Sequence, residues 1–160
     1  MTVAPLAFAG PLDRARLCRD RHDRLVDAMR QQGLEVLLLL GQTNVLYATG
    51  ARVPSRDQSE ALHRRAAAVV TADGAPPIVW TWAPDGVPDA LGVDVRGGLE
   101  LEWDEGAAQL AASLPAGRLA ADDLTMPCWR ALAPREPADA STTLTAAKIV
   151  KTDDELECIR

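Results

Sequence analysis

The sequence predicts an α/β fold in which a mixed β-sheet is flanked by helices. Helix-like and strand-like segments alternate along the chain, as they do in layered α/β domains. The aliphatic run Val36–Leu40 has no polar alternation, which is typical of a strand covered by helices on both faces. Two later apolar runs, Ala66–Thr71 and Ile78–Trp82, flank a turn-forming segment, so part of the sheet is expected to be antiparallel.

The chain is expected to begin with a long amphipathic helix. Apolar residues recur at three- and four-residue steps between Leu12 and Gln32, and Gly33 follows them as a helix-ending residue. After the first strand, Thr43–Gly50 fits a short helix that ends at a glycine. The polar segment Ala51–Glu60 has no hydrophobic period, which is typical of a surface loop.

The second half of the chain carries shorter elements. Asp104 is expected to cap a helix over residues 105–114, and Thr125 is expected to cap another short helix. Trp80 and Trp82 share one face of a predicted strand, so we interpret both as core aromatic residues. Three further strand candidates are Val93–Val95, Arg118–Ala121 and Ser141–Thr145.

The end of the chain begins a new helix. Thr152 and Glu155 have the spacing of a capping box, in which each side chain bonds the backbone N–H of the other residue. Leu156 and Ile159 open an apolar stripe, but an isolated helix of about two turns is too short to be stable alone. We therefore expect Lys151–Arg160 to be marginally ordered unless it packs on a neighbouring molecule, and we interpret it as the start of a second unit.

Composition and charge exclude several classes of protein. The 160 residues are 48% hydrophobic with a mean hydropathy of -0.06, as in a single folded globular domain. The formal net charge of -6 argues against binding to nucleic acid or an anionic membrane, and the 4% aromatic content is too low for base stacking. No apolar run is long enough to span a bilayer. Three cysteines without close spacing predict no disulfide framework and favour a cytoplasmic location.

Patterns typical of catalytic and metal sites are missing from the sequence. His22 and His63 are isolated from further ligand residues, so no metal site is predicted. The pairs Asp122–Asp123 and Asp153–Asp154 lie at predicted helix starts, which favours capping or solvation over acid–base catalysis. Ser59 has no nucleophile elbow around it. We therefore predict no catalytic residue in this chain.

Arg64 carries the remaining functional signal. Together with His63 and Arg65, it lies between the predicted loop and the strand Ala66–Thr71, where a guanidinium can project from the end of the sheet. Such a group can hold a carboxylate in a bidentate fork. A solubilising charge at the start of a strand is the alternative explanation. We assign Arg64 and His63 to a candidate substrate-binding site.

Two motifs frame the chain and point to a family. They are Asn-Val-Leu-Tyr-x-Thr-Gly after the aliphatic strand, and Lys-Thr-Asp-Asp-Glu-Leu-x-x-Ile-Arg at the end. The full set of matching segments is Arg24-Leu25 with Met29, Gly33-Leu34, Val36–Leu39, Asn44–Gly50 and Ala147–Arg160. In order and separation these segments resemble the N-terminal domain of the creatinase, prolidase and aminopeptidase P family.

The resemblance implies a ribonuclease-H-like, three-layer α/β domain. In that family the closing motif leads into a separate pita-bread catalytic domain, which binds two divalent metals (Mn, Co or Zn) and contains the catalytic histidines. The resemblance therefore implies a non-catalytic accessory domain that shapes substrate access and contributes to a homodimer. Residues 1–11 would be a frayed N-terminus, residues 12–146 the domain, and residues 147–160 the linker and first turns of a truncated catalytic domain.

The resemblance also bears on Arg64. Creatinases place an Arg just before the strand that Ala66–Thr71 resembles, where it contacts the substrate carboxylate. Creatinases lead into that Arg with Phe and Gly, whereas this chain has Leu62 and His63. A dipeptidase or aminopeptidase that acts on Xaa-Pro peptides is therefore favoured over a creatinase-like amidinohydrolase. The alternative from another class is a free-standing small-molecule or protein-binding module of the same fold.

Overall fold

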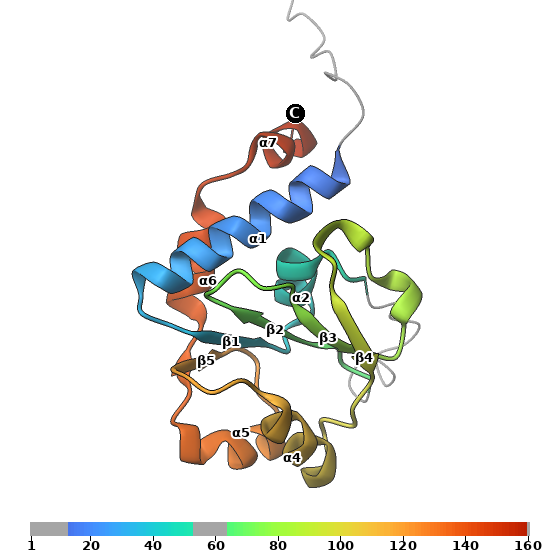
Figure 1. Ribbon diagram of the computed structural model, residues 1–160, viewed down its shortest axis with the longest axis vertical. Helices are drawn as coiled ribbons and strands as arrows, with labels where there is room; N and C mark the ends of the chain where they lie inside the picture. Colours follow the sequence, from blue (N-terminus) through green and yellow to red (C-terminus); the bar gives the residue numbers. More distant parts are fainter. Residues whose placement is uncertain (1–12, 53–63, 160) are drawn as a thin grey trace, which may run out of the picture.

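A computed structural model of the protein describes residues 13–52 and 64–159. Its centre is a six-stranded sheet with the strand order β4-β3-β2-β1-β5-β6 (Figure 1). The strands are β1 (Val36–Leu39), β2 (Ala67–Thr71), β3 (Ile78–Thr81), β4 (Asp94–Gly97), β5 (Leu119–Ala121) and β6 (Ala138–Asp139). The α-helices are α1 (Arg14–Gln31), α2 (Gln42–Thr49), α4 (Asp104–Ser113), α5 (Met126–Leu132), α6 (Ser141–Ile149) and α7 (Asp153–Ile159). The frayed start predicted for residues 1–11 and most of the loop predicted for residues 51–60 lie outside the described residues.

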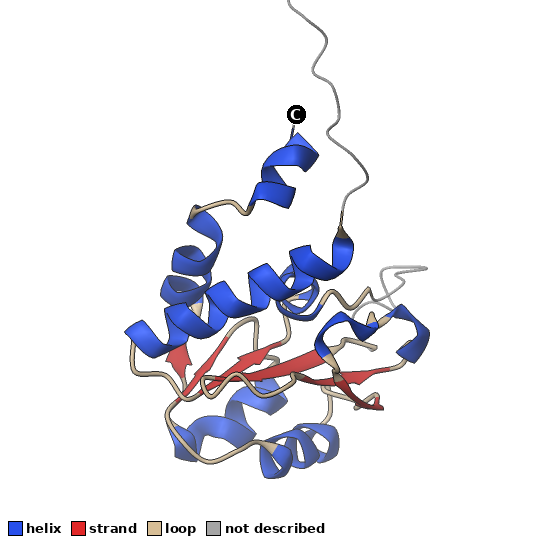
Figure 2. Cartoon of the chain, turned by 45° about the horizontal axis from the view of Figure 1, so that its top comes forward, coloured by secondary structure: helices blue, strands red, loops and turns tan. Residues whose placement is uncertain are grey.

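Helices cover both faces of the sheet, which makes a three-layer domain. α1, α2 and α6 lie on one face, and α4 and α5 lie on the other (Figure 2). Side chains alternate along β1, so Leu37 and Leu39 join the core under the first layer, and Val36 and Leu38 join the core under the second. All four side chains are at most 1% exposed, as predicted for a strand covered on both faces. The predicted α/β fold with a mixed, helix-flanked sheet is confirmed.

Because of the strand directions, the carboxyl-terminal ends of several strands lie at the same edge of the sheet. β1 pairs antiparallel with β2 and parallel with β5. β3 runs antiparallel to β2, as the predicted hairpin requires, while β4 runs parallel to β3 and β6 runs parallel to β5. The ends of β1, β3, β4, β5 and β6 and the start of β2 therefore lie at the same edge. We call it the carboxyl edge.

Glycines end the first two helices, as the sequence predicts. Gly33 follows α1 with a φ of 64°, and Gly50 ends α2 with a φ of 73°. Both values lie in the left-handed region that glycine adopts without steric cost. A Cβ atom at position 50 would also lie 2.7 Å from the Sγ atom of Cys18, so space as well as conformation requires glycine there.

The structure corrects the strand predicted at Ser141–Thr145. These residues form the first half of α6, and the last strand is the short β6 that precedes it. The threonines of this segment favour a strand locally. However, Thr143, Leu144 and Ala147 are buried with helical spacing, and the helix packs against α1. Tertiary packing therefore overrides the local preference.

The capping predictions hold for one helix and fail for the other. Thr125 caps α5 as predicted, because its Oγ1 accepts a hydrogen bond from the backbone N–H of Cys128 at 3.3 Å. Asp104 is not the cap of α4. Trp103 occupies the cap position without a side-chain bond, and Asp104 lies in the first turn, where its negative charge complements the helix dipole.

α7 packs against α1 at the end of the described chain (Figure 1). The predicted capping box is present: the backbone N–H of Thr152 donates to Glu155 Oε2 at 3.0 Å, and the N–H of Glu155 donates to Thr152 Oγ1 at 3.1 Å. Arg16 and Arg21 of α1 form ion pairs with Asp154 and Glu155, at 2.6 and 2.8 Å. We call these four charged residues the α1–α7 clasp. Through the α1–α7 clasp, α1 provides the packing surface that α7, a helix of about two turns, needs in order to be stable.

Candidate functional site

Arg64, the residue with the strongest functional signal in the sequence, lies at the carboxyl edge. It is exposed and precedes β2. Its guanidinium carbon lies 5.8 Å from the centre of the Trp82 ring, within range of a cation–π contact. His63, the second residue predicted to bind substrate, lies outside the described residues.

Trp82 provides the aromatic surface next to Arg64. It follows the last residue of β3 and is 44% exposed, whereas Trp80 is buried at 4%. The prediction of core packing is therefore confirmed for Trp80 and wrong for Trp82, which lies beyond the end of the strand. The Trp82 ring lies against Gly98, where an added Cβ atom would come within 2.5 Å of three ring atoms. Gly98 thus leaves the space in which the indole lies.

Arg65 is bound by carboxylates of the protein itself. Its Nη1 donates to Asp123 Oδ2 at 3.0 Å, and its Nε lies 3.4 Å from Glu102 Oε1 as a charge contact without hydrogen-bond alignment. Asp123 has a φ of 40°, in the left-handed region that aspartate adopts more readily than most residues. The contacts with Asp123 and Glu102 give Arg65 a structural role at the carboxyl edge.

Asp122 caps α2 from the neighbouring strand. Its Oδ1 accepts hydrogen bonds from the backbone N–H groups of Leu40 at 2.6 Å and Gly41 at 3.2 Å. Its Oδ2 accepts one from the side-chain amide of Asn44 at 2.5 Å. Gly41 is the cap residue of α2 and has no side chain for that purpose, so Asp122 supplies the carboxylate. The sequence predicts capping or solvation for this aspartate, but it does not predict contact with this helix.

The crevice between β1 and β5 is the place where sheets of this kind accept ligands. β1 continues into α2 on one face and β5 continues into α5 on the other, so the chain diverges where these parallel strands end (Figure 2). The carboxylate of Asp122 lies at this point and already complements the start of α2. An anionic ligand is therefore not expected between β1 and β5.

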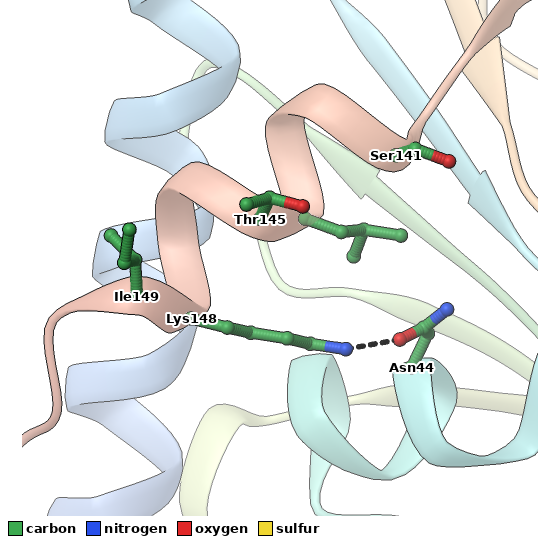
Figure 3. Close-up of a pocket in the computed structure, with 6 residues that line it drawn as sticks. Asn44, Ser141, Thr145, Lys148 and Ile149 are labelled. Atoms are coloured by element: carbon green, nitrogen blue, oxygen red, sulfur yellow. Dashed lines mark hydrogen bonds between the residues drawn. The ribbon is translucent and has the colours of Figure 1, made fainter.

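A hollow of about 400 Å³ lies between the start of α2 and α6 (Figure 3). The Nζ of Lys148 donates to the Oδ1 of Asn44, whose amide group in turn binds Asp122. Burial lowers the pKa of Lys148, and the negative charge of Asp122 opposes that change. The sequence did not single out Lys148, because one lysine in a mostly apolar segment resembles any surface charge. The hollow is lined by Asn44, Ser141, Leu144, Thr145, Lys148 and Ile149.

The described ranges 13–52 and 64–159 contain no group of three or more His, Cys, Asp or Glu side chains that could hold a metal ion. Within the same ranges, no helix is long and apolar enough to cross a membrane. Cys18 and Cys128 are free, and burial raises the pKa of both thiols, which makes them less reactive at neutral pH. The chemistry that remains for the described residues is that of two cationic side chains, Arg64 and Lys148, which can hold an anionic group.

Comparison with known proteins identifies the family of the chain. The model of the creatinase/prolidase N-terminal domain matches residues 21–128. Dipeptidase PepE from Mycobacterium ulcerans shares the fold with a TM-score of 0.62 and 21% identity, over 92% of this chain and 40% of that one. A search of the curated proteins finds no match.

Two further solved structures share the fold. An Xaa-Pro aminopeptidase from Streptococcus pyogenes has a TM-score of 0.52 and 19% identity, over 78% of this chain and 90% of that one. The prolidase from Pyrococcus horikoshii OT3 has a TM-score of 0.57 and 11% identity, over 86% of this chain and 37% of that one. The chain thus spans well under half of the dipeptidase and of the prolidase. Because the family match extends over more than half of its residues, the chain belongs to the creatinase/prolidase N-terminal domain family.

Proposed function

We propose that this chain is the non-catalytic N-terminal domain of a metal-dependent Xaa-Pro dipeptidase or aminopeptidase. In that role it shapes the access of peptide substrates to the active site and contributes to a cytoplasmic homodimer. Family membership over residues 21–128 is the observation that carries the proposal. In this proposal residues 12–146 form the accessory domain, and residues 147–160 lead into the pita-bread catalytic domain.

The solved structures that share the fold support this role. Their names describe a dipeptidase, a prolidase and an Xaa-Pro aminopeptidase. The alignments take up 40% of the dipeptidase and 37% of the prolidase, so each of these proteins has further chain in which a catalytic domain can reside. By analogy, hydrolysis would take place in the domain that follows this one.

The metals of such a peptidase, Mn, Co or Zn, would be held by the catalytic domain. The described residues do not fit a metal centre, because they bring no three His, Cys, Asp or Glu side chains together. Asp122, the carboxylate with the most hydrogen bonds at the carboxyl edge, is already bound to the start of α2. We therefore derive no catalytic step in this chain.

Arg64 is the residue through which the domain would contact substrate, with His63 as its neighbour. The indole of Trp82 lies beside its guanidinium, and Arg65 anchors the adjacent backbone through Asp123. A guanidinium can bind a carboxylate through two parallel N–H···O bonds. Arg64 would accordingly bind the free carboxylate of a peptide and select it over peptides whose carboxylate is blocked.

Steady-state kinetics of the enzyme that contains this domain test the proposal. Arg64→Ala is expected to raise KM for a dipeptide with a free carboxylate by about ten- to a hundredfold, because a charge-assisted contact is lost. KM for the corresponding dipeptide amide should stay unchanged. Arg96→Ala is the matched control, because Arg96 contacts the ring of buried Trp80 at 5.2 Å on the neighbouring strand.

Two results would contradict the proposal at different levels. If Arg64→Ala has the same KM as the parent enzyme on both acid and amide, Arg64 does not bind substrate. If the protein containing this domain cleaves no Xaa-Pro peptide in the presence of Mn, Co or Zn, the assignment to a peptidase is wrong.

A further inference from the structure

The hollow between α2 and α6 is a second place where the protein can bind an anionic group. Its volume of about 400 Å³ lies within the range of small-molecule pockets. Neither Arg64 nor Trp82 is among its lining residues, so it is distinct from the candidate substrate contact.

Lys148 gives the hollow a positive charge that is only partly compensated. The side chain is half-buried, and its ammonium donates to the neutral amide oxygen of Asn44 and lies 5.2 Å from the centre of the Tyr47 ring. Within the described residues no carboxylate forms an ion pair with it, and Asp122 is connected to it through Asn44. An ammonium group has three N–H donors, so Lys148 retains donors for a ligand.

The remaining lining combines a hydroxyl group with apolar surface. The hydroxyl of Thr145 and the side chain of Lys148 both project from α6 toward the side on which Asn44 lies (Figure 3). The aliphatic surface of the lining comes mainly from Ile149, which is 72% exposed although it is apolar, because Leu144 is 6% exposed and belongs to the core. This lining matches a ligand with one charged end and an aliphatic body.

Neighbouring charges determine how much negative charge the ligand can carry. Asp122 is close enough to favour the protonated form of Lys148, and it therefore repels an anion bound there. The positive charges of Lys151 and Arg21 act in the opposite direction. The charges around the hollow therefore favour an anionic ligand, and Asp122 weakens that attraction without reversing it.

We propose that the hollow binds a small aliphatic monocarboxylate, either a free acid or the C-terminal carboxylate of a short peptide with an apolar last residue. The carboxylate accepts hydrogen bonds from the ammonium of Lys148 and the hydroxyl of Thr145. The aliphatic body contacts the exposed side chain of Ile149. Ligand binding thereby gives the half-buried ammonium an ionic partner, which the residues at 13–52 and 64–159 do not provide.

Titration of the isotope-labelled chain with 3-methylbutanoate tests this site by NMR. We expect saturable shifts at the amides of Asn44, Thr145 and Lys148, with a Kd on the order of 1–10 mM. The uncharged 3-methylbutanamide should bind at least about tenfold more weakly. Inorganic phosphate, which has no aliphatic body to contact the apolar lining, should also bind more weakly. Glycyl-leucine and leucine distinguish the two sources of carboxylate, because the ammonium of leucine lies next to its carboxylate and is repelled by Lys148, while that of the dipeptide lies farther away.

Variants separate this site from general effects of charge. Lys148→Met keeps the aliphatic stem and should raise the Kd for 3-methylbutanoate at least about tenfold. Lys151→Met is the matched control, because Lys151 lies outside the lining and its Nζ donates to the Lys148 carbonyl at 2.8 Å. It should change the Kd less than about threefold. Thr145→Val, at an exposed position, should weaken binding about two- to fivefold and serves as the test if Lys148→Met fails to fold.

The proposal is overturned by any of three results: no saturable shifts, equal binding of acid and amide, or undiminished binding by a folded Lys148→Met variant. It does not rest on the proposed peptidase role. Arg64→Ala should leave the binding of 3-methylbutanoate unchanged, and a negative titration would leave the kinetic test of Arg64 unaffected.

Discussion

Arg16, at the start of α1, donates two hydrogen bonds to the carboxylate of Asp154 in α7, at 2.8 and 2.6 Å. These residues are 138 positions apart in the chain. The carboxylate is 3% exposed, and the hydrogen bonds from Arg16 hold the pKa of Asp154 below its usual value. Because a helix of about two turns does not form alone, this contact is central to the order of α7.

Removing the guanidinium of Arg16 should loosen α7 without unfolding the domain. Arg16→Gln is expected to increase the hydrogen-exchange rates of the backbone amides in residues 153–156 by on the order of fivefold, while the β1 amides stay protected. Arg14→Gln is the control, because Arg14 lies on the same turn and forms no ion pair with α7 in the described part of the chain. Equal exchange rates in the two variants would show that the clasp does not stabilise α7.

Asp122 should be the most important single carboxylate for stability. Asp122→Ala leaves the N–H groups of Leu40 and Gly41 and the amide of Asn44 without their acceptor, and we expect a loss of about 1–3 kcal/mol in the free energy of unfolding. Urea denaturation measures this change. Asp123→Asn is the control, because its ion pair with Arg65 is exposed and Asn tolerates a positive φ, so the loss should stay below about 1 kcal/mol.

Gly98 and Gly97 provide a matched pair for testing the position of Trp82. In Gly98→Ala the added Cβ would clash with the indole, so the ring should move away from Arg64 and become more accessible to acrylamide quenching. In Gly97→Ala the Cβ meets no atom within 4 Å, and quenching should not change. Both variants should keep the free energy of unfolding within about 1 kcal/mol of the parent. Difference spectra against Trp82→Phe assign the signal, and identical quenching of both alanine variants would contradict the contact.

His22 should make the stability of the domain depend on pH. Its side chain is 5% exposed at the interface of α1 with α2, and burial lowers its pKa below the ordinary 6.5. The unfolded chain therefore binds the proton more tightly, so the free energy of unfolding should fall as the pH drops below about 6.5, at no more than about 1.4 kcal/mol per pH unit. In the His22→Gln variant, the dependence of the free energy of unfolding on pH that His22 causes between pH 5 and 7 should disappear. His63 is still present in this variant. An unchanged slope would mean that His22 is not the responsible group.

The sequence predicted correctly those elements whose buried residues follow a regular hydrophobic pattern within the element itself. The aliphatic run of β1, the apolar stripe of α1 and the capping box at Thr152 all appear where they were expected. The segment Ser141–Thr145 was predicted wrongly, because its β-branched residues favour a strand whereas its packing on α1 requires a helix. Pattern alone does not show which of the two effects is stronger.

The site depends on contacts between distant parts of the chain, which the sequence does not reveal. Asp122 meets Asn44 across 78 positions, and Lys148 meets Asn44 across 104. Arg64 could be singled out from its place before a strand, but its contact with Trp82 depends on where β3 ends. Sequence analysis could therefore identify chemically suitable residues, while the topology of the sheet decides which of them meet.

The clasp between the first and last helices also has a mechanical consequence. A pull on the chain beyond α7 would reach α1 through two ion pairs before it strained any strand of the sheet. α1 in turn packs on α2 and α6, so the load would spread through one complete layer of the domain. A change in the orientation of a body tethered after α7 would therefore act first on α1 and then on the end of α2, where Arg21 contacts the ring of Tyr47.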